Sequence, residues 1–167
     1  SRDWSSDVCS SDLIATSNAI ENKAEPGQFR RDDEIFIADN DGNSLYQPPP
    51  HGQVHTLMEA VCTFANNTYD GSENPFIHPV VQAIILHFLI GYIHPFGDGN
   101  GRTSRALFYW FMLKNGYWLF EYISISRLLK NAPAQYAKSY LHAETDDLDL
   151  TYFIYYQCDI IKRAVTD

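Results

Sequence analysis

The stretch His94–Arg105 reads HPFGDGNGRTSR and combines an imidazole, a carboxylate, three glycines and two guanidiniums within twelve residues. It directly follows residues 80–93 (VVQAIILHFLIGYI), one of the most apolar segments of the chain. Core packing does not call for such a mixture of charged, polar and flexible residues. We therefore interpret residues 94–105 as a ligand-binding segment.

The flanking sequences predict that this segment joins two buried helices. Residues 80–93 are apolar nearly all round, which indicates a helix through the centre of the domain, with Pro79 in its first turn. Residues 102–116 predict a second buried helix that ends at Asn115-Gly116. The backbone N–H groups of residues 99–102 would then be the uncapped donors of a helix N-terminus, which attracts anions.

The residue types at this helix start suit a polyphosphate. Glycines at positions 97, 99 and 101 would allow positive φ and close approach of a ligand to the backbone. Arg102 and Arg105 lie three residues apart on one helical face and can offer several donors to phosphates.

Asp98 and His94 add chemistry to this anion site. A carboxylate beside bound phosphates indicates that a divalent cation such as Mg²⁺ bridges Asp98 and the phosphates. His94 can accept a proton near neutral pH, and a hydroxyl nucleophile would be its natural proton donor. Together these residues predict phosphoryl or nucleotidyl transfer.

The rest of the chain predicts an all-α domain with one β-hairpin. Two short segments, 34–38 and 43–46, flank an Asp41-Gly42 turn and predict the hairpin. Apolar spacing predicts the further helices, at residues 14–22 (a helix end), 54–68, 126–144 and 150–164.

Composition limits the class of protein. With 167 residues, of which 45% are hydrophobic, the chain can bury one sizeable core, and we expect one domain. The formal net charge is −9 and there is no run of lysines and arginines, so nucleic acid and anionic membranes are poor partners. The longest apolar run is shorter than the roughly 20 residues of a membrane-spanning helix.

The first residues and the cysteines give two further expectations. Residues 3–13 (DWSSDVCSSDL) look like a translated sequencing adapter, so we expect a non-native leader over 1–13 and a single domain over 14–167, truncated at both ends. Cys62 and Cys158 lack metal-site or disulfide spacing, which favours reduced thiols and a cytoplasmic location.

The segment HPFGDGNGRTSR resembles the Fic-domain signature, His-x-Phe-x-Asp/Glu-Gly-Asn-Gly-Arg-x-x-Arg, at every fixed position. The similarity continues through PGQFR, IHPVVQAIILHF, RALFYWFMLKNGYW, SISRLLKNAPAQY and DLTYFI, over residues 26–165. The resemblance implies a Fic-type helical bundle with a small β-hairpin flap, which agrees with the hairpin predicted from turn chemistry.

The resemblance also implies a protein adenylyltransferase. His94 would deprotonate a Ser, Thr or Tyr hydroxyl of a target protein, which would attack the α-phosphate of ATP. Asp98 would hold Mg²⁺, and Phe96 would anchor the segment in the core. The implied phosphate-binding residues are Gly99, Asn100 and Gly101 as an anion hole, Arg102 on the phosphates and Arg105 on the terminal phosphate.

Other implications concern docking and regulation. Ile35, Phe36 and Ile37 of the flap would align the target segment as an added strand. Residues 17–22 (SNAIEN) fit the family's inhibitory pattern, Ser/Thr-x-x-x-Glu-Gly/Asn, in which Ser17 and Glu21 would be the inhibitory residues and Glu21 would pair with Arg105. A chance match is the alternative, because only three residues separate this pattern from the core block at Pro26.

Two rival functions stay open at this point. One is a Fic enzyme that uses another nucleotide or removes AMP from a modified target. The other is a non-catalytic nucleotide-binding regulator, against which the intact His94 and Asp98 argue. A homodimer is one candidate assembly.

Overall fold

The computed structural model describes residues 27–35, 37–38, 44–131 and 133–166. The predicted leader over 1–13, the helix end over 14–22 and the residues Ser17 and Glu21 lie outside these ranges. In chain order the elements are β1 (Ile37–Ala38), β2 (Ser44–Tyr46), α2 (His51–Asn66), α3 (Pro79–Ile93), α4 (Asn100–Lys114), the 3-10 helix η1 (Trp118–Glu121), α5 (Ile125–Asn131), α6 (Pro133–Thr145) and α7 (Thr151–Thr166). The all-α class with a small hairpin is confirmed.

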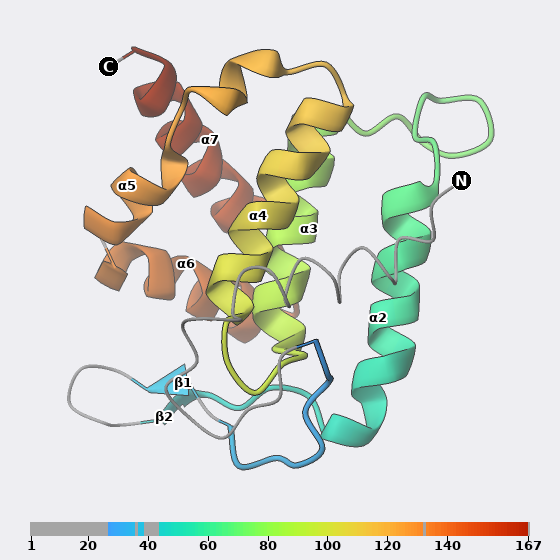
Figure 1. Cartoon of the computed structure of the whole chain (residues 1–167), viewed down its shortest axis with the longest axis vertical. Coiled ribbons are helices and arrows are strands. Elements are labelled where there is room, and N and C mark those ends of the chain that lie inside the picture. The colour runs from blue at the N-terminus through green and yellow to red at the C-terminus, as the bar shows by residue number, and fades with distance from the viewer. Residues whose placement is uncertain (1–26, 36, 39–43, 132, 167) are drawn as a thin grey trace.

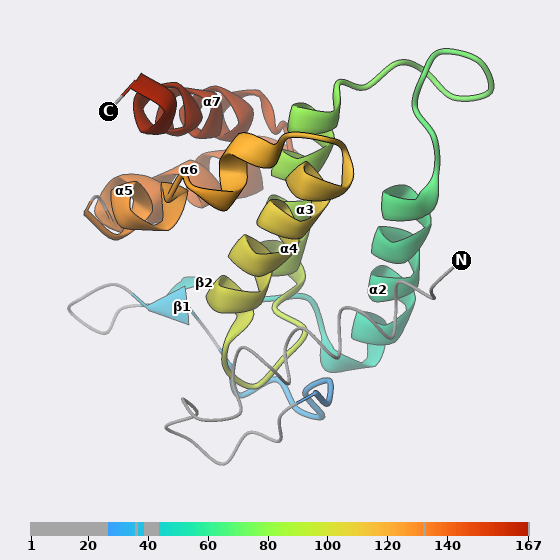
Figure 2. The same ribbon diagram turned by 45° about the horizontal axis from the view of Figure 1, so that its top comes forward.

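Helices α3 and α4 form the centre of the molecule as an antiparallel pair (Figure 1). Helix α2 lies on one side of this pair, and α5, α6 and α7 lie on the other, in both views (Figures 1 and 2). Ile84, Leu86 and Ile90 of α3 are completely buried. A helix covered on several sides needs apolar residues around most of its circumference, which explains why α3 shows little amphipathic pattern.

Local sequence explains where the central helices begin and end. Pro79 is the first residue of α3, and the ring of His78 accepts a hydrogen bond from the Val80 N–H at 3.2 Å. Helix α4 begins at Asn100, two residues before the predicted start at 102. Gly116 has a φ of 85°, so the predicted glycine stop after α4 is confirmed.

Helix α2 is amphipathic, as its spacing predicted. Its buried residues are Val54, Met58, Val61 and Ala65, which share one face. The helix starts at His51 instead of 54 and ends at Asn66 instead of 68. His51, Gly52 and Gln53 precede the first apolar side chain, Val54, so hydrophobic periodicity could not have located the start of the helix.

The prediction of one helix over 126–144 was wrong. Two helices occupy this region, α5 ending at Asn131 and α6 beginning at Pro133. Proline has no N–H to continue a helix, and it disfavours the helical conformation in the residue before it. The short helix η1 was not predicted either, because four residues give too little periodicity.

The two strands of the hairpin pair antiparallel, Ile37 with Tyr46 and Ala38 with Ser44, with an irregularity between the pairs. The turn at 41–42 and Phe36 lie outside the described residues. Tyr46 joins the hairpin to the last turn of α3, because its hydroxyl donates to the Tyr92 carbonyl at 3.1 Å and the two rings lie 5.6 Å apart. The hairpin is thereby held beside the end of α3.

Of the helices that the structure describes, none combines the length and the apolar character needed to cross a bilayer.

Candidate functional site

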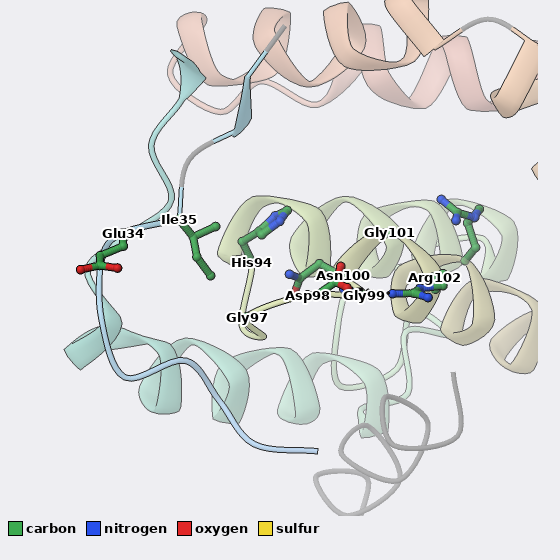
Figure 3. A pocket seen from close by; sticks show the side chains of 10 residues that line it. Glu34, Ile35, His94, Gly97, Asp98, Gly99, Asn100, Gly101 and Arg102 are labelled. Atoms are coloured by element: carbon green, nitrogen blue, oxygen red, sulfur yellow. Dashed lines mark hydrogen bonds and ion pairs between the residues drawn. The ribbon is translucent and has the colours of Figure 1, made fainter. Parts of the chain in front are cut away.

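A pocket of about 530 Å³ opens where α3 ends and α4 begins (Figure 3). Its lining consists of Glu34, Ile35, His94, Gly97, Asp98, Gly99, Asn100, Gly101, Arg102 and Arg105. The structure thus brings together every site residue predicted within 94–105, and it adds Ile35 of the predicted flap. Ile37 lies in β1, and its side chain is outside the part of the chain that the structure describes.

His94 is positioned by the way α3 ends. Its own N–H still bonds the Ile90 carbonyl at 3.1 Å, but its backbone is left-handed, with φ 49° and ψ 57°. Such a conformation costs a non-glycine residue about 1–2 kcal/mol, so neighbouring contacts must hold it. The ring bends back onto the helix, where Nδ1 lies 3.0 Å from the Gly91 carbonyl oxygen.

This contact fixes the tautomer of the neutral imidazole. A carbonyl oxygen only accepts hydrogen bonds, so Nδ1 carries the proton and Nε2 keeps its lone pair. Burial lowers the pKa of His94, and the positive charge of Arg30 lowers it further, whereas the Gly91 hydrogen bond and the charge of Asp98 act in the opposite direction. The net lowering keeps the ring neutral at neutral pH, as a general base requires.

The start of α4 is built around Gly99, whose φ of 87° makes it a left-handed N-cap. Its N–H donates to Asp98 Oδ1 at 2.6 Å, and its carbonyl accepts from the N–H groups of Arg102 and Thr103 at 2.9 Å each. The expectation that the N–H groups of 99–102 are all free for an anion is therefore too broad. Within the described chain, the N–H groups of Asn100 and Gly101 remain as the first-turn donors.

The three glycines act differently from one another. Among the three, only Gly99 has a positive φ, so the backbone freedom that glycine allows is used in that form at this position alone. Gly101 leaves room for a close approach instead, because a Cβ there would lie 3.2 Å from Nη1 of Arg105, a tight contact that would push the guanidinium outward. The missing side chain allows the Arg105 guanidinium to lie over the first turn of α4.

The Asn100 side chain is engaged inside the protein. It is 2% exposed, and its Oδ1 accepts from the Phe96 N–H at 2.9 Å while its Nδ2 donates to the Phe96 carbonyl at 2.8 Å. Phe96 is 1% exposed and forms part of the core, as predicted. The side-chain amide of Asn100 therefore closes the loop between α3 and α4. The backbone N–H of Asn100 is the group of this residue that is left for an anion at the helix start.

Asp98 and Arg102 form an ion pair of 3.2 Å at the pocket, with side chains 31% and 33% exposed. In Figure 3, Glu34 and Ile35 stand on one side of His94, and Asp98 and Arg102 stand on the other. A partly exposed carboxylate fits a Mg²⁺ ion that takes its other ligands from phosphates and water. The described residues contain no cluster of three or more potential metal ligands, so these residues fit that kind of shared site and not an all-protein cage.

Two residues at the site were missed by sequence reasoning. Glu34 lines the pocket next to Ile35, and Arg30 donates a hydrogen bond to the His94 carbonyl across 64 positions of the sequence. No local pattern marks either residue. The only available signal was that Arg30 lies in PGQFR, one of the segments that resemble Fic domains.

Comparison with known proteins agrees with this site. Residues 7–112 match the sequence model of the Fic/DOC family. This chain belongs to the Fic/DOC family. It is 36% identical over 93 residues to "Protein adenylyltransferase Fic" of Drosophila willistoni, covering 56% of this chain and 16% of that protein. It is 30% identical over 114 residues to the protein of the same name from Drosophila melanogaster, and this match covers 66% of this chain and 21% of that protein.

Solved structures of Fic proteins share the fold. A Fic family protein from Desulfovibrio desulfuricans superposes with a TM-score of 0.80 at 24% identity, over 97% of this chain and 46% of that chain. Fic-1 of C. elegans superposes with a TM-score of 0.65 at 22% identity, over 97% of this chain and 43% of that chain. This Fic chain spans about a fifth or less of the curated Drosophila relatives.

Proposed function

We propose that this chain is a protein adenylyltransferase that transfers AMP from ATP to a Ser, Thr or Tyr hydroxyl of a target protein. The observation that carries the proposal is one pocket in which a neutral imidazole lies beside a glycine-capped helix start and two guanidiniums. The relatives named protein adenylyltransferase Fic support the same chemistry.

The residues of this chain divide the reaction between them. Nε2 of His94 takes the proton of the target hydroxyl, whose oxygen attacks the α-phosphorus. The bond from the α-phosphorus to the bridging oxygen breaks, and pyrophosphate leaves. The N–H groups of Asn100 and Gly101, with Arg102 and Arg105, hold the phosphates and the charge that develops on them.

Asp98 is the residue that would hold Mg²⁺ at the phosphates. When bound there, the ion would neutralise phosphate charge and help to orient the triphosphate. Asp98 also pairs with Arg102, so the carboxylate keeps that guanidinium at the mouth of the pocket.

The target would dock along the hairpin. Ile35 lines the pocket, and strands β1 and β2 form a short two-stranded sheet whose edge can accept an extended segment. Phe36 and Ile37 belong to the same proposed docking segment. Such pairing would bring a hydroxyl of the target toward His94.

Labelling with α-³²P-ATP tests the proposal. A lysate or purified candidate targets should acquire label from α-³²P-ATP and none from γ-³²P-ATP, and His94→Ala should abolish labelling while leaving ATP binding intact. Label from the γ-phosphate would contradict AMP transfer. Equal ATP binding with no labelling by either protein would favour a nucleotide-binding regulator.

The same assay separates the remaining enzymatic alternatives. Preference for label from α-³²P-GTP, -CTP or -UTP would identify another nucleotide donor. Loss of AMP from a previously labelled target would identify the reverse activity. If Glu21 restrains Arg105, then Glu21→Gly should raise the labelling rate, whereas an unchanged rate would make the SNAIEN match a coincidence.

A further inference from the structure

We infer that Arg30 is a positioning residue for the reaction: it holds the catalytic end of α3 and the base of the hairpin in one fixed arrangement. The inference rests on the proposed function. Arg30 does not line the pocket, so it acts through His94 and through the hairpin.

The guanidinium of Arg30 is a buried charge with a hydrogen-bond partner on each of its three nitrogens. Its side chain is 1% exposed. Nε donates to the His94 carbonyl at 2.9 Å, and Nη1 donates to the Asp32 carbonyl and to Asp33 Oδ1, each at 2.9 Å. Nη2 donates to the Pro49 carbonyl. An arginine this deeply buried requires such partners, because an unpaired buried charge is very unfavourable.

Arg30 meets the end of α3 where the helix needs a donor and a positive charge. The last carbonyls of a helix lack intrahelical partners and carry partial negative charge. The side chain bonds the His94 carbonyl, and the Arg30 backbone N–H donates to the Pro95 carbonyl at 2.8 Å. Phe29 and Phe96 form the adjoining antiparallel bridge. The left-handed backbone of His94 is therefore held on its C-terminal side by Arg30.

The His94 ring depends on this backbone. Its N–H is fixed by Ile90, its Nδ1 by Gly91 and its carbonyl by Arg30. The first two contacts lie within the last turn of α3 and are lost if that end of the helix frays or rotates. Arg30 supplies the contact that comes from outside the helix.

The same guanidinium closes the base of the hairpin. Asp32 and Asp33 immediately precede the pocket residues Glu34 and Ile35, and Pro49 follows β2 on the other side of the hairpin. Both ends of the hairpin thus attach to the side chain that holds His94. Arg30 thus joins the two walls of the pocket. A substitution of Arg30 should therefore move the docking segment of the hairpin relative to His94.

The test compares Arg30→Met, which keeps much of the side-chain length but removes all donors, with Arg30→Lys, which keeps the charge. Arg31→Met is the matched control, since Arg31 is the next residue, is exposed and has Gln28 as a hydrogen-bond partner. We measure the single-turnover rate of AMP transfer, the Kd for ATP and the Tm of each protein.

We expect Arg30→Met to slow transfer by about 10- to 100-fold, because misplacing a reactive group by about 1 Å has effects of that size. The Kd for ATP should change by less than about threefold, since phosphate binding uses the start of α4. Arg30→Lys should recover part of the rate, and Arg31→Met should match the wild type. A purely structural role would instead lower rate and ATP affinity together with the folded fraction.

A second readout does not depend on activity. Nitrogen-15 spectra of the imidazole at about pH 8, where the ring is neutral, report which nitrogen of His94 carries the proton, and His94→Ala assigns the signal. Wild type should show the Nδ1–H form, and Arg30→Lys and Arg30→Met should move toward the Nε2–H form favoured in water.

An unchanged transfer rate or an unchanged tautomer in folded Arg30→Met would overturn the inference. If Arg30→Met does not fold, the same comparison with Arg30→Lys decides. If wild type transfers no AMP while the tautomer still changes, the proposed function fails and the positioning of His94 by Arg30 stands.

Discussion

Replacement of Asn100 by alanine separates two roles that this residue could have. The signature implies that Asn100 binds phosphate, whereas its side chain in this structure is occupied by the backbone of Phe96. Asn100→Ala would leave the N–H and the carbonyl of Phe96 without partners, in a residue that is 1% exposed. The main effect of Asn100→Ala should therefore be a loss of folding stability, not a direct loss of phosphate binding.

The size of the effect follows from these two groups. An unsatisfied buried polar group costs about 1–3 kcal/mol, so two give about 2–6 kcal/mol. Some relaxation of the loop will reduce this, and we expect a loss of about 2–4 kcal/mol in the free energy of unfolding. With a urea m-value of about 2 kcal/mol/M, the unfolding midpoint should fall by about 1–2 M.

Urea unfolding followed by circular dichroism measures this loss, and ATP binding is measured under conditions where wild type and Asn100→Ala are both folded. Asn115→Ala is the matched control. Asn115 caps the other end of α4, and its Nδ2 donates to the Phe111 carbonyl at 2.8 Å, but Asn115 is exposed, so water can replace that hydrogen bond. The control should lose less than about 1 kcal/mol. A stable Asn100→Ala protein that has lost ATP binding would refute the reasoning and restore a direct phosphate contact.

Three further predictions concern neighbouring residues. Burial lowers the pKa of His87 to about 3, and the positive charge of Arg105 contributes to the lowering. Below about pH 6.5 the unfolded state therefore binds a proton that the folded state does not. The free energy of unfolding should fall as the pH falls from 6.5 toward 3. His87→Phe should flatten the pH dependence of the urea midpoint by at most about 1.4 kcal/mol per pH unit, and parallel curves would contradict this assignment. Asp98→Asn should make the Kd for ATP insensitive to Mg²⁺ while changing stability by less than about 1 kcal/mol, since the ion pair is partly exposed; retained Mg²⁺ dependence would exclude Asp98 as the ligand. Gly101→Ala should displace the Arg105 guanidinium and weaken ATP binding by about three- to tenfold. The Tm should be unchanged or raised, because alanine favours a helix over glycine by about 1 kcal/mol. An unchanged Kd for ATP would show that the guanidinium does not need the space at Gly101.

The site could largely be located from sequence because its residues are local. Residues 94–105 span one helix end, one turn and one helix start, so chain connectivity alone brings them together. The buried helices on either side were also predictable, since a long apolar segment leaves few alternatives. Glycine chemistry was less predictable, because the letter G does not distinguish the positive φ of Gly99 from the space that Gly101 leaves for Arg105.

Contacts between distant residues could not be predicted in this way. Arg30 meets His94 across 64 positions, and the buried His87 bonds the Tyr136 hydroxyl at 2.7 Å across 49 positions. In neither pair does the sequence around one residue indicate which distant residue it contacts. The role of Asn100 was hidden for a different reason: the signature records that an asparagine is present, whereas only coordinates show which groups its amide bonds.

The most direct test of the account is a crystal structure of the chain with Mg²⁺ and α,β-methylene-ATP. The triphosphate should lie over the first turn of α4, where the N–H groups of Asn100 and Gly101 donate to phosphate oxygens. The unprotonated Nε2 of His94 should lie on the side of the α-phosphate. A triphosphate bound away from this turn, or a His94 ring whose Nε2 points away from the α-phosphate, would contradict it.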